Sequence, residues 1–213
     1  MWASGRGPAD PRNWVARADI SRPQWQGRVL EGVLDVGYYG AGGFTGAAQM
    51  RRARTLAEEQ AVRLRTYGAA SPDDASNLQT VAALLSAWAH GADAFSCWQS
   101  LGSEEALDRN DTGAEAGSAL LVPGDRFGIK VVGDMRLKAL RDAQQLIEYL
   151  SLLAERQHLT RDQVRAMLGE ALASQGVRTG GSESGGDDAL ELTGLTAWDL
   201  YQLRRRVADL LAR

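Results

Sequence analysis

Several aromatic and amide side chains lie at the ends of short apolar segments, and these residue types are suited to binding a ligand rather than to catalysis. Trp98 and Gln99 follow an apolar run that begins at Ala94. A flat aromatic face can stack on the apolar face of a ring, and an amide can pair with hydroxyl groups. The alternative is a tryptophan of the protein core beside a polar residue that caps the segment.

Tyr38, Tyr39, Tyr67 and Asn77 are the other candidate binding residues. Tyr38 and Tyr39 end a second apolar segment, and only one of them can point to a given face because side chains alternate along a strand. Tyr67 ends a third segment, where it either lines the mouth of a site or packs on the next helix. Asn77 either contacts the ligand or caps the helix that follows it.

Metal and cofactor chemistry is not indicated by the sequence. Cys97 is the single cysteine, which excludes an internal disulfide and a multi-cysteine metal site. His90 and His158 lie far apart, with no second ligand type at metal spacing. We therefore expect no bound metal and no cofactor. Asp19 lies close to Arg22 in the sequence, and we expect these two residues to form an internal ion pair.

Short apolar segments bounded by glycine or proline predict strands, and amphipathic segments between them predict helices. The predicted strands are 14–20, 33–39, 62–67 and 94–99, and the predicted helices between them are 47–60 and 77–90. A strand, a helix and a strand at this spacing are typical of a parallel sheet. The sequence therefore predicts the α/β class.

The character of the chain changes after residue 100. Residues 101–133 are polar and contain glycines, apart from an apolar island at 118–123, and they predict a long loop with a short strand or hairpin. Residues 135–155 have leucine or isoleucine every three or four positions. This spacing predicts an amphipathic helix, which we expect to pack on the sheet as the last helix of the domain.

Two capping boxes predict further helices near the C-terminus. Thr160 with Gln163 begins a helix through Ala173, and Thr196 with Asp199 begins one through Leu211. The predicted organisation is a disordered or truncated segment at 1–12, a main domain at 13–156, and a helical extension at 157–213 with a Gly/Ser-rich linker at 176–188.

Composition excludes several classes of partner. The chain has 213 residues, of which 44% are hydrophobic, and a net charge of -3 with basic and acidic residues interspersed. This pattern indicates no nucleic-acid or anionic membrane surface, and no apolar run is long enough to span a bilayer. Residues 1–10 lack the apolar region of a signal peptide. We expect a cytoplasmic protein as the chain stands, or a secreted or periplasmic one if its true N-terminus lies upstream.

Six motifs, in this order and at this spacing, resemble one protein family. They are "ADISRPQW" (Ala18 to Trp25), "LDVGYY" (Leu34 to Tyr39), "SNLQ" (Ser76 to Gln79), "AWAHGADAFSCWQS" (Ala87 to Ser100), "LLVPGD" (Leu120 to Asp125) and "MRLKALRDAQQLIEYLSLL" (Met135 to Leu153). Together they resemble the C-terminal segment of bacterial glycoside-hydrolase-like proteins of domain of unknown function 4091, which are related to glycoside hydrolase family 123. The chain departs from the family at four positions: the family often has Gly where Ala94 stands, Pro where Cys97 stands, an aromatic residue where Arg65 stands and Asp where Leu146 stands. The first three positions lie close to the expected rim of the active site.

The resemblance implies a (β/α)8 barrel of TIM type. This chain would supply its C-terminal part, about four βα units, followed by C-terminal helices. The binding site would lie at the carboxyl ends of the strands, with Trp98, Gln99 and the tyrosines on its rim. The implied ligand is carbohydrate, with N-acetylhexosaminides among the candidates.

The catalytic residues stay unassigned. In the related hydrolase family an acidic pair lies on an earlier strand, and no Asp-Glu dipeptide ends a predicted strand here. Two hypotheses therefore remain open. The chain is either part of a glycosidase whose acid/base pair lies in a missing N-terminal half, and is inactive alone, or a non-catalytic carbohydrate-binding or scaffold protein. A four-stranded half barrel has open edges, so we expect self-association or pairing with that missing half.

Overall fold

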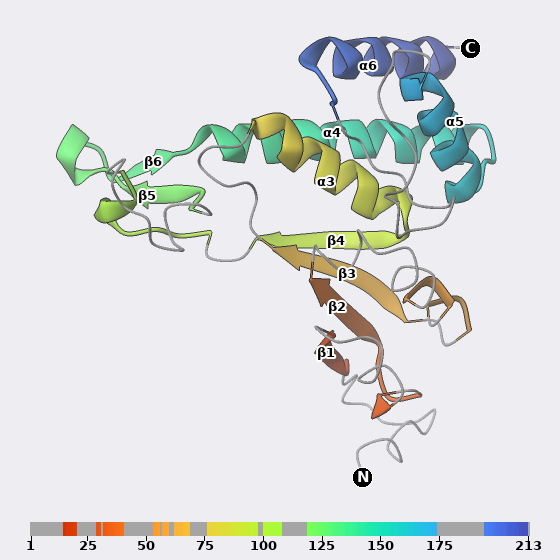
Figure 1. The fold of residues 1–213 in the computed structure, drawn as a ribbon, viewed down its shortest axis with the longest axis horizontal. Helices are drawn as coiled ribbons and strands as arrows, with labels where there is room; N and C mark the ends of the chain where they lie inside the picture. The colour runs from red at the N-terminus through yellow and green to blue at the C-terminus, as the bar shows by residue number, and fades with distance from the viewer. Residues whose placement is uncertain are drawn as a thin grey trace.

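A computed structural model of the chain describes residues 15–20, 29–30, 32–40, 53–55, 57–59, 62–68, 76–97, 100–107, 119–173 and 194–212. In these segments a small β-sheet lies beside a stack of helices, with β4 nearest the helices and β1 farthest from them (Figure 1). The predicted N-terminal segment 1–12 and the linker 176–188 lie outside the described residues, and so do Trp98 and Gln99.

The sheet has four parallel strands in chain order. They are β1 (Arg17–Ile20), β2 (Val36–Gly40), β3 (Arg63–Gly68) and β4 (Ala92–Cys97). Each strand overlaps one of the predicted strands, and the parallel pairing confirms the α/β class. β4 begins earlier than predicted and carries an irregularity, because Leu64 and Arg65 pair with Ala92 and Ala94, which leaves Asp93 between them.

The crossover from β3 to β4 is helix α3 (Asn77–Ala89). Ser76 is its N-cap, and the Ser76 hydroxyl accepts a hydrogen bond from the backbone N–H of Leu78 at 3.3 Å. Of the two roles considered for Asn77, capping of this helix is therefore wrong, since Asn77 is the first residue of the helix. Gly91, with φ of 101°, turns the chain from the helix directly into β4, in a backbone conformation that favours glycine.

A small hairpin follows the sheet and confirms the strand predicted within the long loop. β5 (Leu121–Pro123) and β6 (Val131–Gly133) pair antiparallel, and a short 3-10 helix, η4 (Asp125–Phe127), joins them. A second 3-10 helix, η3 (Glu104–Leu107), precedes the hairpin. Figure 1 places the hairpin beyond the carboxyl ends of β3 and β4.

The three C-terminal helices are α4 (Met135–Arg156), α5 (Arg161–Ala173) and α6 (Ala197–Leu211). Both predicted capping boxes are present: the Thr160 N–H donates to Gln163 Oε1 at 2.8 Å and the Gln163 N–H to Thr160 Oγ1 at 3.2 Å, and Thr196 pairs with Asp199 in the same way. In the described part of the chain no helix combines the length and apolar character needed to cross a membrane.

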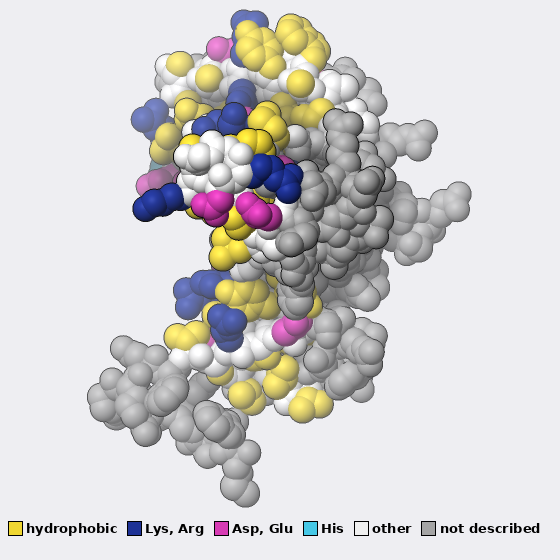
Figure 2. All heavy atoms as spheres, turned by 90° about the vertical axis from the view of Figure 1, so that its left-hand side faces the viewer, with side chains coloured by type: hydrophobic (Ala, Val, Ile, Leu, Met, Phe, Trp, Pro, Cys, Tyr) yellow, Lys and Arg dark blue, Asp and Glu magenta, His cyan; other side chains and the backbone are white. Residues whose placement is uncertain are grey.

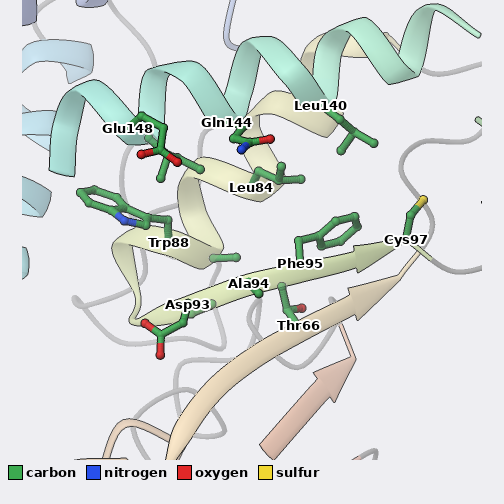
Figure 3. Close-up of a pocket in the computed structure, with 13 residues that line it drawn as sticks. Thr66, Leu84, Trp88, Asp93, Ala94, Phe95, Cys97, Leu140, Gln144 and Glu148 are labelled. Carbon is green, nitrogen blue, oxygen red and sulfur yellow. The ribbon is translucent and has the colours of Figure 1, made fainter. Parts of the chain in front are cut away.

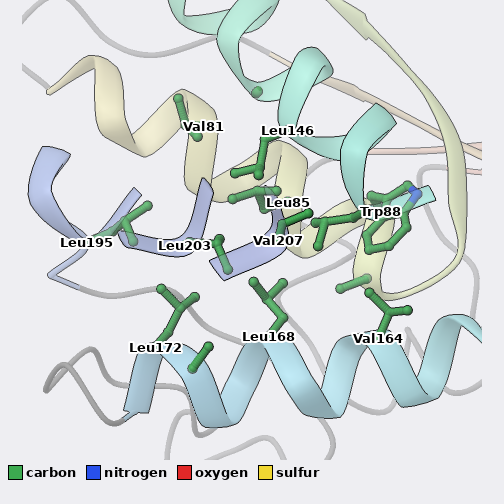
Figure 4. Packing of buried hydrophobic residues seen from close by; sticks show 14 of the residues in the cluster. Val81, Leu85, Trp88, Leu146, Val164, Leu168, Leu172, Leu195, Leu203 and Val207 are labelled. Atoms are coloured by element: carbon green, nitrogen blue, oxygen red, sulfur yellow. The ribbon is translucent and has the colours of Figure 1, made fainter. Parts of the chain in front are cut away.

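Helices α3 to α6 share one apolar core. Its fully buried members include Leu85, Leu146, Leu150, Leu153, Val164, Leu168, Leu172, Leu203 and Val207 (Figure 4). The leucines of α4 that predicted a helix packed on the sheet therefore pack mainly against other helices. α4 contacts chiefly α3 and α6, and it faces β4 across a groove.

A second core covers one face of the sheet. Ile20, Tyr39, Leu64 and Ala92 point to this face and are buried there against Leu34, Ala53, Val62 and Ala87. Because side chains alternate along each strand, the residue next to each of these in its strand, such as Asp19 or Tyr38, points to the opposite face. That opposite face carries the polar side chains described next.

Candidate functional site

Polar side chains from three neighbouring strands meet on the face of the sheet opposite the apolar core. The register aligns Asp19 with Tyr38 and Tyr38 with Arg65, while Arg17 and Tyr67 lie two residues away on the same faces of β1 and β3. We call Arg17, Asp19, Tyr38, Arg65 and Tyr67 the strand-face cluster. Each of these side chains is partly or fully exposed.

Tyr38 is the centre of the strand-face cluster. Its hydroxyl accepts a hydrogen bond from Arg65 Nη1 at 2.7 Å. The guanidinium carbons of Arg17 and Arg65 lie 5.1 and 5.6 Å from the centroid of its ring, within cation–π range. The hydrogen bond from Arg65, the charges of Arg65 and Arg17 and a hydrogen bond from Ser96 lower the pKa of Tyr38 and outweigh partial burial, which raises it. The phenol therefore lies in a positive local potential.

Tyr67 and Asp19 form the second contact of the cluster. The Tyr67 hydroxyl donates to Asp19 Oδ1 at 2.9 Å, so the bond reaches from β3 to β1 across β2. Partial burial, together with this hydrogen bond and the charge of Asp19, raises the pKa of Tyr67. The phenol keeps its proton and acts as a donor, while Asp19 Oδ2 has no hydrogen-bond partner among the described residues.

A cavity of about 220 Å³ lies among these side chains. Its described lining comes from Arg17, Asp19, Tyr38, Tyr67, Ser96 and Cys97. Figure 2 looks toward the carboxyl ends of the strands and shows Lys and Arg side chains gathered at the height of β2 and β3, below a hollow in that face. Ligands of parallel α/β sheets bind outside the carboxyl ends of the strands, and this cavity lies on that side.

The structure brings together two of the predicted binding residues. Tyr38 and Tyr67 line the cavity. Tyr39 does not, because it is 3% exposed in the core on the other face, so the predicted alternation of Tyr38 and Tyr39 is confirmed. Asn77 begins α3 and lies outside the described lining. Trp98 and Gln99 follow β4 directly, but they lie outside the described residues.

Arg17, Asp19 and Arg65 were not among the binding residues predicted from the sequence. Their signal was present: Arg17, Asp19, Arg63, Arg65 and Tyr67 recur every second residue in segments predicted to be strands of a parallel sheet, which are usually apolar on both faces. Asp19 was expected to pair with Arg22, a residue outside the described part. The partner that the structure shows for Asp19 is Tyr67.

A second cavity of about 410 Å³ lies between α4, α3 and β4 (Figure 3). Leu84, Phe95 and Leu140 project into it, and Asp93 and Glu148 lie near one end. This cavity is an apolar groove beside β4, whose partner in the described sheet is β3 alone. Its lining suits packing against another apolar segment better than the recognition of a polar ligand.

The donor set of the strand-face cluster suits hydrogen bonding and not metal binding. No group of three His, Cys, Asp or Glu side chains that could hold a metal ion occurs in the segments that the structure describes. Asp19 is the single carboxylate among the described lining residues. The cluster therefore offers phenol, guanidinium and carboxylate groups to a polar ligand.

Comparison with protein families, with curated protein sequences and with solved structures finds no match to this chain. The family resemblance carried by the six sequence motifs therefore stays a prediction.

Proposed function

We propose that this chain binds carbohydrate at the strand-face cluster, as the C-terminal part of a (β/α)8 barrel of glycoside-hydrolase type. The observation that carries the proposal is the contrast between the two faces of one parallel sheet. One face is an apolar core, whereas the other has Asp19, Tyr38 and Tyr67 around a cavity toward the carboxyl ends of the strands. The six motifs of the sequence support the same assignment.

The chemistry of the cluster fits the ligand class. A sugar presents hydroxyl groups and apolar ring faces, and tyrosine offers a hydroxyl together with an aromatic face. Asp19 Oδ1 accepts from Tyr67, and its Oδ2 is available to accept from a sugar hydroxyl. Hydrogen bonds of this kind, with a carboxylate as acceptor, are the stronger type.

Binding without hydrolysis is the activity that this part of the chain supports. Most glycoside hydrolysis needs two carboxyl groups about 5 to 9.5 Å apart on either side of the bond that breaks. The described lining of the cavity holds one, Asp19. A complete hydrolase would need its second carboxyl group from a part of the barrel outside this cluster.

The test is binding of the full chain to a panel of immobilised glycans, followed by calorimetry with the best soluble oligosaccharide. Tyr67→Phe removes a hydroxyl from the cavity lining together with the hydrogen bond that positions Asp19, and we expect it to weaken glycan binding about tenfold. Trp98→Ala should weaken binding further if the tryptophan stacks on the sugar, as the sequence predicts. The chain should not release the aryl group of aryl N-acetylhexosaminides.

Tyr149→Phe is the matched control, because Tyr149 is an exposed tyrosine on α4, away from the sheet. It should bind as the unchanged chain does. The proposal is wrong if no glycan binds, or if Tyr67→Phe and Tyr149→Phe have equal effects. Turnover of aryl glycosides that a substitution in this chain abolishes would contradict the non-catalytic role.

A further inference from the structure

We infer that the carbohydrate bound at the strand-face cluster is anionic, and that Arg17 and Arg65 bind its carboxylate or sulfate group. The inference rests on the proposed function and specifies its ligand. It depends on how positive charge is placed on this face of the sheet, on the contacts of the two guanidinium groups with Tyr38, and on the cavity that Arg17 and Tyr38 line.

Three arginines lie on the same face of two strands. Arg17 aligns with Val36 and Val36 with Arg63, and Arg65 lies two residues after Arg63. None of the three takes part in an ion pair among the described residues, although Arg54, Arg136, Arg161 and Arg165 each do. Among the described lining residues of the cavity Asp19 is the one acidic group. This face therefore carries an excess of positive charge in a chain whose net charge is -3.

The geometry shows that Asp19 does not neutralise these arginines. Arg17 and Asp19 lie on the same face of β1, two residues apart, yet the hydrogen bond to Asp19 Oδ1 comes from Tyr67. Arg17 lies over the ring of Tyr38 instead, with its guanidinium carbon 5.1 Å from the centroid. Asp19 thus pairs with a phenol, and no carboxylate of the described residues forms an ion pair with Arg17 or Arg65.

Tyr38 orders the two guanidinium groups. Arg65 donates from Nη1 to the Tyr38 hydroxyl at 2.7 Å, and both groups lie within cation–π range of the same ring. Arg65 Nε is buried and has no hydrogen-bond partner in the described structure. Arginine presents five N–H donors in a planar fork, so Nη2 of Arg65 and the fork of Arg17 have donors left for a ligand.

An anion completes this arrangement. Two guanidinium groups held near one ring repel each other, and a carboxylate or sulfate bound beside that ring offsets the repulsion by charge-assisted hydrogen bonds. Arginine matches the planar oxygen pair of a carboxylate and also the tetrahedral oxygens of a sulfate. Tyr67 and Asp19 also line the cavity and remain available for the hydroxyl groups of the same sugar.

The experiment compares four probes by calorimetry on the full chain. Oligogalacturonate carries carboxylates, heparin-derived oligosaccharide carries sulfates as well, maltohexaose is neutral, and single-stranded DNA is an anion without the sugar hydroxyl pattern. We expect at least one anionic glycan to bind about tenfold or more tightly than maltohexaose, and tighter binding of oligogalacturonate or of heparin fragments identifies the group. Raising NaCl from about 50 to about 500 mM should weaken that binding several-fold, because the screening length shortens.

Arg65→Gln and Arg17→Gln should each weaken binding of the anionic glycan about tenfold, which is a larger loss than either substitution causes for maltohexaose. Arg205→Gln on the exposed side of α6 removes the same charge and should have no effect. Circular dichroism and the salt series on the unchanged chain keep the test decisive should one variant fold poorly. Equal binding of neutral and anionic glycans overturns the inference but leaves carbohydrate binding intact. Tighter binding of DNA than of either glycan overturns it, and absence of binding to every glycan overturns both proposals.

Discussion

Removing the Asp134 carboxylate tests whether the start of α4 depends on one residue. Asp134 is the N-cap of α4, and its Oδ1 accepts from the backbone N–H of Arg136 at 2.7 Å and from Arg136 Nε at 2.9 Å. Its Oδ2 accepts from Nη2 of the same arginine at 3.2 Å. Arg136 is 7% exposed, so these contacts hold a charge that water reaches poorly. We expect Asp134→Ala to destabilise the chain clearly.

The expected loss of stability in Asp134→Ala is the sum of two contributions. Loss of an N-cap costs about 1 kcal/mol. Loss of the charge-assisted bonds to Arg136 costs up to about 3 kcal/mol when fully buried, but the Asp134 side chain is 38% exposed, so we take about 1 kcal/mol for this contribution. The total of about 2 kcal/mol should lower the thermal midpoint by roughly 4 to 8 °C in a chain of this size. Asp134→Asn keeps a cap acceptor and should lose about half as much.

The pH dependence has a definite sign. Burial raises the pKa of Asp134, but the hydrogen bonds from the side chain and backbone of Arg136 and its charge outweigh burial and lower the pKa below its ordinary value. A lowered folded-state pKa means that the carboxylate stabilises the fold above its unfolded pKa of about 3.9, and that this stabilisation is lost as pH falls through the folded-state pKa. The difference between the unchanged chain and Asp134→Asn should therefore shrink from pH 6 toward pH 3.

Thermal and urea unfolding followed by circular dichroism are the assays, with Asp125→Ala as the control. Asp125 is an exposed aspartate of the hairpin that precedes α4, in the short helix η4. The reasoning is refuted if Asp134→Ala and Asp125→Ala differ by less than about 0.5 kcal/mol. A stability difference for Asp134→Asn that stays constant with pH would refute the assignment of the charge to this contact.

Two further predictions concern the core and the open edge. Leu146→Ala removes a fully buried side chain from the core of α3 to α6 and should lower the free energy of unfolding in urea by about 2 to 5 kcal/mol. Leu152 is 38% exposed, and Leu152→Ala should lower that free energy by less than about 1 kcal/mol. Equal losses for the two variants would contradict the packing. The full chain should associate in light scattering coupled to size exclusion, because β4 is an edge of the described sheet. Phe95→Lys, in β4, should reduce association more than Val131→Lys on the hairpin. A sharp 23.0 kDa species at all concentrations would contradict the open edge.

Local periodicity was sufficient to predict most of the elements. The α3, α4, α5 and α6 helices have apolar residues every three or four positions and side-chain caps. Both patterns involve residues that are close together in the sequence, so they can be recognised without the fold. β4 shows the limit of this approach. Asp93 resembles a turn residue in the sequence, yet it lies within the strand opposite a register shift and pairs with Arg161 of α5 at 3.4 Å. The contact between Asp93 and Arg161 joins residues far apart in the sequence, so no local sequence pattern predicts it.

The site was harder to predict because it depends on register. The sequence shows that Tyr38 and Tyr39 point to opposite faces, but which of them is buried depends on the side chains that cover one face, among them Leu34 and Ala53. The pairing of Tyr67 with Asp19 also depends on how three strands align, because the bond crosses β2. Candidate residue types could therefore be selected from the sequence, whereas the partners of each residue could not.

The charge on the strand face also limits how a barrel could close around it. Closing the sheet, with another copy or with further strands, would move Arg17 and Arg65 toward an interior with less water. Guanidinium groups without counter-charges are costly there, because desolvation of a charge must be offset by a partner. Among the described residues of this face, a second copy would double these arginines and add one carboxylate, its own Asp19. A closing partner of different sequence must therefore bring carboxylates to this face, or an anionic ligand must supply the missing negative charge, so closure of the sheet and ligand binding should depend on each other.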